Sequence, residues 1–336
     1  MAGGNGKESH GVLRVAVIGC GRISQVHLHT IAREPRVRLV AVADIDGKAA
    51  SGAGEAFGVP AFTDPDDMLT KIHPDAVILC TPPNTHRCLA EAALSAGAHL
   101  LCEKPLAITL EDAEHMMHAA EAAGRTLMMA SKFRYVQDVI KARGIIYSGI
   151  LGEVILFENE FCSRVEMKSR WNSRADVAGG GVLIDNGCHS VDIVRYLLGP
   201  VEGVRVLFGK KWQQLEVEDT CHLHVHVRSG TMASIDLSWS LHKESPYYIH
   251  VYGTAGTLEV GWQGSRYRQS EKLDWIAFGN GYDKFQAVGA QLANFIDTVN
   301  GAGQPLITSA DALESVRVIQ TAYKNAELDR WDKVPM

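Results

Sequence analysis

The chain has 336 residues, of which 46% are hydrophobic and 21% are charged, and its formal net charge is −6. This length is enough for about two domains with separate cores. The composition is that of an ordinary globular protein, and it excludes the basic excess typical of proteins that bind nucleic acid or anionic membranes. We therefore expect small molecules as partners.

Seven cysteines are scattered along the chain and never form a CxxC pair, so the sequence predicts neither a disulfide framework nor a zinc knuckle. This cysteine usage favours a reducing, cytoplasmic compartment. The opening segment is polar and glycine-rich and lacks the apolar core of a signal peptide, and no later run has membrane-spanning length. We expect residues 1–11 to form a disordered tail.

The first regular element is a β-branched strand over residues 12–18, followed by a glycine turn and a helical pattern through Ile31. Gly19 permits a tight bend, and Gly21 lets the backbone approach a pyrophosphate closely. The N–H groups at the start of the helix then attract that anion. Ser24 stands where a third Gly or Ala is usual, and it is small enough for close packing. The pattern predicts a dinucleotide-binding turn.

A second strand over residues 38–43 ends in Asp44, close to the spacing expected for the acid that binds the cofactor ribose. A carboxylate there accepts both ribose hydroxyls of NAD. It would repel the 2′-phosphate of NADP by about 1 kcal/mol in bulk water and about 4 kcal/mol at an effective dielectric of 20. The sequence therefore favours NAD over NADP. The alternatives are that Asp44 caps the next helix and that Arg22 offsets the repulsion.

Strands and helices continue to alternate in the first half of the chain. Strands are predicted over 75–80, 98–102 and 125–130, and helices over 85–96 and 110–123. This alternation indicates a doubly wound α/β sheet that ends near Ser131. In such sheets ligands bind at the carboxyl ends of the strands, so we expect Thr81–His86 and Glu103–Pro105 at the cofactor edge. His86 has the alternative interpretation of an ordinary first-turn helix residue.

Further along, Asp185 and His189 are four residues apart in a segment, 182–198, whose apolar positions predict a buried helix. Residues at i and i+4 share one face, so a carboxylate and an imidazole project together from an apolar element. Buried polar groups need partners, which would be each other, a ligand or Lys104. The alternative is a structural Asp–His pair in the core. Asp192 is a candidate for orienting His189.

Taken together, these motifs resemble the glucose-fructose oxidoreductase, inositol dehydrogenase and rhizopine-catabolism (Gfo/Idh/MocA) family. The matching segments are Gly19–Ile23, Asp44, Thr81–His86, Glu103–Pro105, the glycine-led Gly179–Asp192 with its D-x-x-x-H pattern, and Gln304–Pro305. The resemblance covers nearly the whole chain. It implies an α/β Rossmann domain over residues 12–131, followed by an α+β domain over residues 132–336 with a large, mainly antiparallel open sheet.

The resemblance also implies a catalytic set of Lys104, Asp185 and His189, and a cis peptide bond before Pro105. A dehydrogenase acting on a secondary alcohol needs a base for the hydroxyl proton, and His189 suits that exchange near neutral pH. Lys104 would stabilise the developing charge on the reacting oxygen, and Asp185 would bind a neighbouring hydroxyl or hold His189. The expected cofactor-binding residues are Gly19, Gly21, Arg22, Ile23, Asp44, Thr81, Pro82, Asn84, His86, Glu103 and Lys104. The expected substrate-binding residues are Lys104, Arg134, Tyr135, Arg170, Trp171, Asp185 and His189.

Four cations, Arg164, Lys168, Arg170 and Arg174, fall within one short loop of an otherwise acidic chain. A solvated charged loop is one interpretation. The other is an anion pocket for a phosphate, nucleotide-sugar or carboxylate substrate.

The second half contains several further predicted strands and two helices that are expected to return to the first domain. The strands are predicted over 153–162, 201–208, 220–227, 231–240, 247–252 and 256–260, and the helices over 284–299 and 311–325. His222, His224 and His226 alternate along one strand and so share a face. Same-face neighbours about 7 Å apart suit a shared ion poorly. We expect no metal site, and we interpret this face as exposed or as the interface of a homodimer or homotetramer.

The sequence therefore predicts an NAD-dependent oxidoreductase that converts a ring hydroxyl of a sugar, sugar derivative or cyclitol to a ketone, or catalyses the reverse. One alternative is a non-enzymatic, NAD-sensing regulator on the same fold, which would not need the groups of Lys104, Asp185 and His189. Another is an NAD-dependent glycosidase. Recycling of a bound cofactor between two substrates is also compatible with the sequence.

Overall fold

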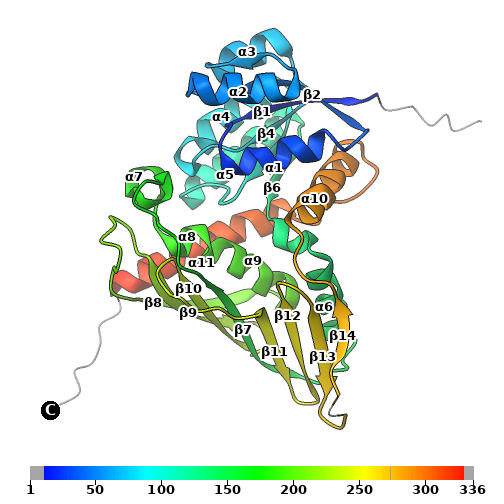
Figure 1. The fold of residues 1–336 in the computed structure, drawn as a ribbon, viewed down its shortest axis with the longest axis vertical. Helices are drawn as coiled ribbons and strands as arrows, with labels where there is room; N and C mark the ends of the chain where they lie inside the picture. The colour runs from blue at the N-terminus through cyan, green and yellow to red at the C-terminus, as the bar shows by residue number, and fades with distance from the viewer. Residues whose placement is uncertain (1–10, 273, 329–336) are drawn as a thin grey trace, which may run out of the picture.

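The computed structural model describes residues 11–272 and 274–328 and contains two β-sheets that lie one above the other along the long axis of the molecule (Figure 1). The predicted tail falls outside the described residues, apart from Gly11.

The upper sheet has six parallel strands in the order β3-β2-β1-β4-β5-β6. Its strands are β1 (Leu13–Ile18), β2 (Val37–Ala43), β3 (Ala61–Phe62), β4 (Ala76–Leu79), β5 (His99–Glu103) and β6 (Leu127–Ala130). Its helices are α1 (Arg22–Ile31), α2 (Gly47–Phe57), α3 (Pro65–Ile72), α4 (His86–Ser95) and α5 (Leu110–Ala123). The residues of β4 are fully buried, because helices cover both faces of the sheet. The predicted Rossmann topology is confirmed, and its strand order reverses between β1 and β4, where ligands of such sheets bind.

The glycine turn after β1 is as tight as the sequence predicts. Gly19 has a φ of 93°, and a Cβ there would lie 2.7 Å from the carbonyl carbon of Cys80. Ser24 fits the place of the usual third glycine, since it is fully buried and its hydroxyl donates to the carbonyl of Gly21 at 2.6 Å. These contacts bring the start of α1 close to the carboxyl ends of β1 and β4.

The lower sheet has eight strands in the order β14-β13-β12-β11-β7-β10-β9-β8. They are β7 (Val154–Cys162), β8 (Val201–Phe208), β9 (Thr220–Val227), β10 (Met232–Ser238), β11 (Tyr247–Gly253), β12 (Gly256–Gly261), β13 (Ser265–Gln269) and β14 (Ile276–Gly279). The pair β7 and β10 is parallel and the other neighbours are antiparallel, which confirms a mainly antiparallel sheet. The sequence did not predict β13 and β14. In β13 the residues are polar or charged around Tyr267, so the strand lacks an apolar alternation.

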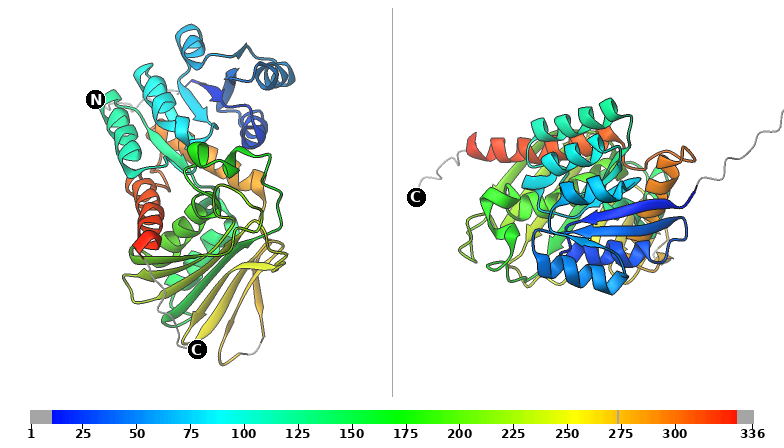
Figure 2. Two further views of the ribbon diagram at one scale, coloured as in Figure 1. Left: turned by 90° about the vertical axis from the view of Figure 1, so that its left-hand side faces the viewer. Right: turned by 90° about the horizontal axis from the view of Figure 1, so that it is seen from above.

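Helices of the second half cover one face of this sheet and connect it to the Rossmann domain (Figures 1 and 2). They are α6 (Gln137–Tyr147), α7 (Ala175–Ala178), α8 (Val182–Asp185), α9 (Gly187–Leu198), α10 (Lys284–Val299) and α11 (Ser309–Leu328). Helix α10 packs on α1, and α11 packs on α5 and β6 of the first domain as well as on β8 and α9 of the second. The two domains therefore share the long C-terminal helices as a common layer.

The predicted helix over residues 182–198 is interrupted in the structure, since α8 ends at Asp185 and α9 begins at Gly187. The buried Glu218 carboxylate holds the start of α8, accepting hydrogen bonds from the N–H groups of Gly181 at 2.9 Å and Leu183 at 3.0 Å. The break leaves Asp185 half-buried at the end of a short helix, where its carboxylate reaches Lys104 of the other domain. None of the helices in the described residues combines the length and apolar character needed to cross a membrane.

Candidate active site

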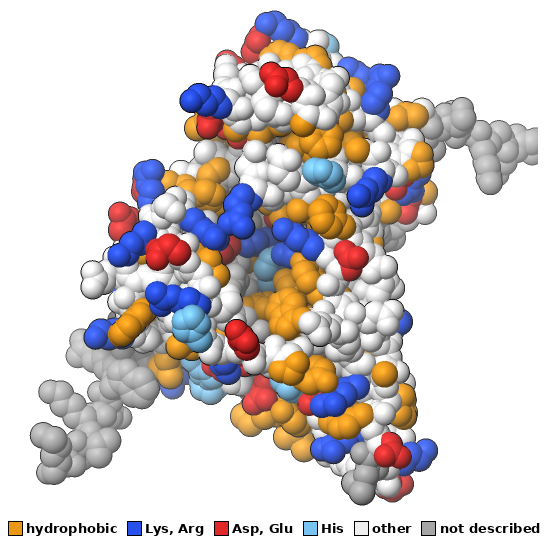
Figure 3. Space-filling view, viewed as in Figure 1, with side chains coloured by type: hydrophobic (Ala, Val, Ile, Leu, Met, Phe, Trp, Pro, Cys, Tyr) orange, Lys and Arg blue, Asp and Glu red, His pale blue; other side chains and the backbone are white. Residues whose placement is uncertain are grey.

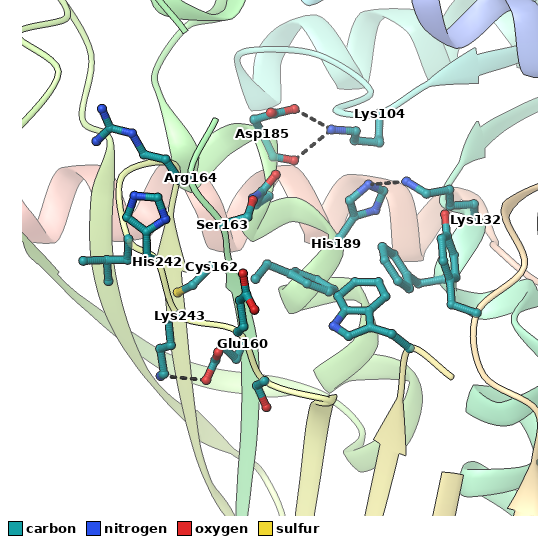
Figure 4. Close-up of a pocket in the computed structure, with 18 residues that line it drawn as sticks. Lys104, Lys132, Glu160, Cys162, Ser163, Arg164, Asp185, His189, His242 and Lys243 are labelled. Atoms are coloured by element: carbon teal, nitrogen blue, oxygen red, sulfur yellow. Dashed lines mark hydrogen bonds and ion pairs between the residues drawn. The ribbon is translucent and has the colours of Figure 1, made fainter. Parts of the chain in front are cut away.

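A cavity of about 800 Å³ lies between the two domains, at the carboxyl edge of the Rossmann sheet and above the lower sheet. Figure 3 shows it as a hollow in the middle of the molecule, with lysine and arginine side chains along its upper edge. Lys104, Lys132, Asp185 and His189 all line it (Figure 4). These four residues come from the segment after β5, the segment after β6, α8 and α9.

Lys104 and Asp185 form an ion pair that joins the two domains. The Lys104 ammonium donates to the Asp185 carboxylate at 2.6 Å and to the Asp185 carbonyl at 2.8 Å. The peptide bond between Lys104 and Pro105 is cis, as the family resemblance implied. Burial alone would lower the pKa of Lys104, but the Asp185 carboxylate outweighs burial and raises that pKa above its ordinary value. Lys104 is therefore a permanent cation at the cavity wall.

His189 lies on the same cavity but outside this ion pair. The side chain is nearly buried, and its edge packs against the Phe133 ring. Burial and the nearby positive charges of Lys132 and Lys104 hold the pKa of His189 well below its usual range. The imidazole is consequently neutral near pH 7. It lines the cavity together with Lys104 and Asp185, so the three residues that the sequence singled out are brought together.

Lys132 is a cavity residue that the sequence reasoning missed. It begins the short 3₁₀ turn Lys132–Tyr135 directly after β6, and its Nζ lies 3.3 Å from Nε2 of His189. The signal that could have found it is position, because it follows the last Rossmann strand at the same carboxyl edge as Lys104.

Aromatic rings form the floor of the cavity. Trp262, Tyr282, Phe133 and Phe161 all line it, and the rings of Phe133 and Tyr282 stack with centroids 5.3 Å apart. Trp262 packs in turn on the buried ring of Tyr248. Such a floor offers apolar faces to the C–H groups of a ring.

The predicted cofactor residues lie along the carboxyl edge of the Rossmann sheet. In the described part of the chain no side chain caps the start of α1, and a Cβ at Gly21 would meet no atom within 4 Å, so backbone N–H groups are open to an anion there. The Asp44 carboxylate accepts hydrogen bonds from the N–H groups of Cys20 at 2.6 Å and Asp46 at 2.8 Å. It therefore links the ends of β1 and β2 at the place where a ribose would lie. This arrangement fits a dinucleotide.

The other predicted cofactor residues differ in how accessible they are. Arg22 and Asn84 are exposed, and Ile23, Thr81, Pro82 and Glu103 are half-buried. The Glu103 carboxylate is held 2.8 Å from Nε2 of the buried His27 on α1. Burial would raise the pKa of Glu103, but His27 and the neighbouring lysines lower it.

The structure corrects the prediction for His86. This side chain is fully buried, and its ring nitrogens lie 2.9 to 3.1 Å from the carbonyl oxygens of Thr81, Pro105 and Leu106. His86 thus connects the segment after β4 to the segment that holds Lys104. It supports the cofactor edge from beneath and has no exposed surface for direct contact.

Arg134 and Tyr135, which were predicted to bind substrate, do not line the cavity either. The Arg134 side chain is only 4% exposed and pairs with the fully buried Asp192 at 2.7 Å and with Asp311 at 3.1 Å. The Tyr135 hydroxyl donates to Asn294 at 2.8 Å. The charge of Arg134 is needed by buried carboxylates, and Asp192 pairs with Arg134 instead of orienting His189.

The cationic loop is only partly at the cavity. Arg164 lines it, whereas Arg170 and Trp171 are not among its lining residues. Lys168 and Arg174 are exposed, which fits a solvated loop for these two cations. One member of the loop therefore faces the site, and Arg170 and Trp171 lie outside the lining of the cavity.

The alternating histidines lie on the outer side of the lower sheet. His222 Nδ1 is 2.6 Å from the Asp236 carboxylate, and His224 and His226 are exposed. Within the described residues no group of three potential ligands is arranged to hold a metal ion. His222 thus has a side-chain partner within the protein, the Asp236 carboxylate.

Comparison with known proteins places both halves of the chain in one family. The profile described as "Oxidoreductase family, NAD-binding Rossmann fold" matches residues 13–131, and the GFO/IDH/MocA C-terminal domain profile matches residues 139–259. The chain is 28% identical to D-apiose dehydrogenase of Paraburkholderia graminis, over 94% of this chain and 88% of the relative. It is also 28% identical to the rhizopine catabolism protein MocA of Rhizobium meliloti, over 92% and 93%.

A solved structure with the same fold is aldose-aldose oxidoreductase from Caulobacter crescentus, with a TM-score of 0.85 and 26% identity over 95% of this chain and 98% of that one. Lys104 of the cis Lys104–Pro105 segment, Asp185 and His189 line one cavity, between domains that each match the family. The chain belongs to the GFO/IDH/MocA family of oxidoreductases and carries its NAD-binding Rossmann domain.

Proposed function

We propose that this protein oxidises a ring secondary hydroxyl of a sugar, sugar derivative or cyclitol to a ketone, or catalyses the reverse, with NAD as hydride carrier. The observation that carries the proposal is the ion pair of Lys104 and Asp185, 2.6 Å long, at the cavity wall below the cofactor edge. A fixed ammonium in a partly buried site stabilises the negative charge that develops on an oxygen as its carbon loses hydride.

Different residues of the chain would bind the cofactor, stabilise the reacting oxygen and accept the hydroxyl proton. Backbone N–H groups at α1 and the Asp44 carboxylate would hold the dinucleotide, which supplies the hydride acceptor. Lys104 would donate a hydrogen bond to the reacting oxygen, and Asp185 would keep Lys104 charged and accept from a neighbouring hydroxyl. The hydroxyl proton would leave on the side of the cavity where His189 lies.

The cavity supports a ring substrate with several hydroxyls. Polar groups line it together with the aromatic rings of Trp262 and Tyr282, and such a lining suits a molecule with an apolar C–H face and a hydroxylated edge. The relatives that are named for D-apiose and rhizopine catabolism support this substrate class. Arg164 at the cavity adds a reason to include acidic sugars among the candidates.

The test is a panel of cyclitols, free sugars, uronic acids and aryl glycosides incubated with the full-length protein and NAD. The proposal predicts NADH formation with at least one ring polyol and a ketone product by mass spectrometry. Tight NAD binding without NADH from any member would support the sensor alternative. Release of an aglycone without net NADH would support the glycosidase alternative.

We also propose that the outer face of the lower sheet mediates self-association, as the sequence predicts. In the described residues the helices pack on the other face of this sheet, and Met232 on β10 is 59% exposed on the outer face. Light scattering of the full-length protein should give the mass of two or four copies, and a single-copy mass at micromolar concentration would refute this.

A further inference from the structure

Lys132 differs from Lys104 in having no counter-ion. Lys104 lies 2.6 Å from the Asp185 carboxylate, whereas within residues 11–272 and 274–328 no carboxylate lies within ion-pair distance of the Lys132 Nζ. Instead the amine lies 3.3 Å from His189 Nε2 and over the Phe133 ring, 5.0 Å from its centroid. A lysine in such a setting loses its proton far more readily than a solvated one.

His189 is arranged to accept a hydrogen bond from Lys132. Its Nδ1 is buried without a hydrogen-bond partner in the described residues, so Nε2 is the nitrogen that interacts with the cavity. A neutral amine that donates one N–H to Nε2 keeps its lone pair free. Both residues line the cavity, and Figure 4 shows Lys132 extending toward His189 there. The lone pair is therefore available to a bound hydroxyl.

We propose that Lys132 is the general base of the reaction and that His189 is the acceptor that orients it. This inference rests on the proposed function. In the oxidative direction the substrate O–H proton moves to the Lys132 amine, the O–H electron pair becomes the C=O π bond, and the C–H electron pair leaves as hydride to NAD. Lys132 then holds the proton as an ammonium and releases it to water in the cavity. Reduction runs the same transfers backwards.

The charges around Lys132 agree with this role. The groups that face it are Lys104, Glu103, Lys284, Asp185 and His189, from five different segments. Burial, followed by the positive charge of Lys104, lowers the pKa of Lys132 to about 8, and the charge of Glu103 limits the shift. A base poised near the working pH is the most effective one. Lys104 cannot share this role, because Asp185 keeps it protonated.

The first experiment needs no substrate. Competitive labelling of the full-length protein with trace acetic anhydride, read by mass spectrometry across a pH series, measures the protonation of each lysine. The reactivity of Lys132 should reach half its maximum near pH 8, well below the ordinary value of about 10.4 for a solvated lysine. A Lys132 midpoint at that ordinary value would overturn the proposal.

The second experiment uses whichever ring polyol of the panel yields NADH. For the wild-type protein, kcat/KM for oxidation should rise tenfold per pH unit below about 8 and then level off. Reduction needs the protonated Lys132, so its kcat/KM should be level below about pH 8 and fall above it. Both Lys132→Met and Lys132→Arg should lose roughly 100-fold or more in kcat/KM and lose this pH step, because methionine is not basic and arginine does not give up its proton in this pH range. Lys141→Met is the matched control and should behave as wild type.

The Arg variant separates catalysis from structure. It keeps the positive charge and an N–H donor for His189, so near-wild-type turnover by Lys132→Arg would refute the role of base. So would an unchanged pH step in Lys132→Met. If the wild-type protein oxidises no member of the panel, the proposed function fails, and the labelling midpoint alone then decides whether Lys132 can take up a proton near neutral pH.

Discussion

Arg134 allows a specific prediction about stability, because both its guanidinium and the Asp192 carboxylate that it contacts are buried. Asp192 is fully buried and accepts from Arg134 and from the Ser131 hydroxyl, at 2.6 to 2.9 Å. Replacing Arg134 by methionine keeps the volume approximately but leaves the Asp192 carboxylate without a counter-ion. Breaking a buried pair in this way costs about 3 to 5 kcal/mol, whereas an exposed pair contributes about 0 to 1 kcal/mol.

The control is Arg36→Met. Arg36 also contacts two carboxylates, Glu34 and Asp297, but its side chain is 43% exposed compared with 4% for Arg134. Urea unfolding and thermal melts of both variants should show a large loss for Arg134→Met, with a melting temperature lower by roughly 5 °C or more, and a small loss for Arg36→Met. The double variant Arg134→Met with Asp192→Asn should recover part of the loss, because the buried charge is then removed. Equal stability of the two single variants would refute the reasoning. So would a double variant that loses more free energy of unfolding than Arg134→Met and Asp192→Asn lose together.

Two further predictions concern the cofactor edge and the turn before α8. Asp44→Ala should weaken NAD binding at least about tenfold. It should also raise the ratio of NADP to NAD affinity, because about 1 to 4 kcal/mol of repulsion toward a 2′-phosphate is removed. An unchanged affinity ratio in fluorescence titrations would argue against ribose binding at Asp44. Gly181→Ala should lower both the melting temperature and turnover, since a Cβ would collide with the backbone carbonyl of Glu218. Gly203→Ala, whose Cβ would lie 3.7 Å from the nearest side chain, should cost little, and equal losses in the two variants would contradict this account.

Much of the fold is predictable from local sequence signals, and the reasons are visible at particular residues. The turn at Gly19 and the D-x-x-x-H pattern at Asp185 and His189 each involve residues that are close together in the sequence, so local patterns are enough to predict them. By contrast, the break between α8 and α9 depends on Glu218, a residue more than thirty positions downstream. The apolar pattern of 182–198 is continuous across that break, so it predicts a single helix.

The substrate side of the site is less predictable because its residues are paired over long distances. Arg134 carries a charge in a segment that enters the second domain, but which carboxylate it meets depends on how α9 and α11 pack. Lys132 is two residues away, and among the described residues the same packing leaves it without a counter-ion at the cavity. Trp262 and Tyr282 reach the floor from loops whose positions follow from the lower sheet.

The central claim is that the Lys104 ammonium stabilises an oxygen that loses its carbon-bound hydride to NAD. The most direct measurement compares Lys104→Ala with wild type on the ring polyol that yields NADH, with NAD affinity determined on the same preparations. We expect a loss in turnover of roughly 100-fold or more while the dissociation constant for NAD changes little. Turnover equal to wild type with an intact cofactor site would contradict the account.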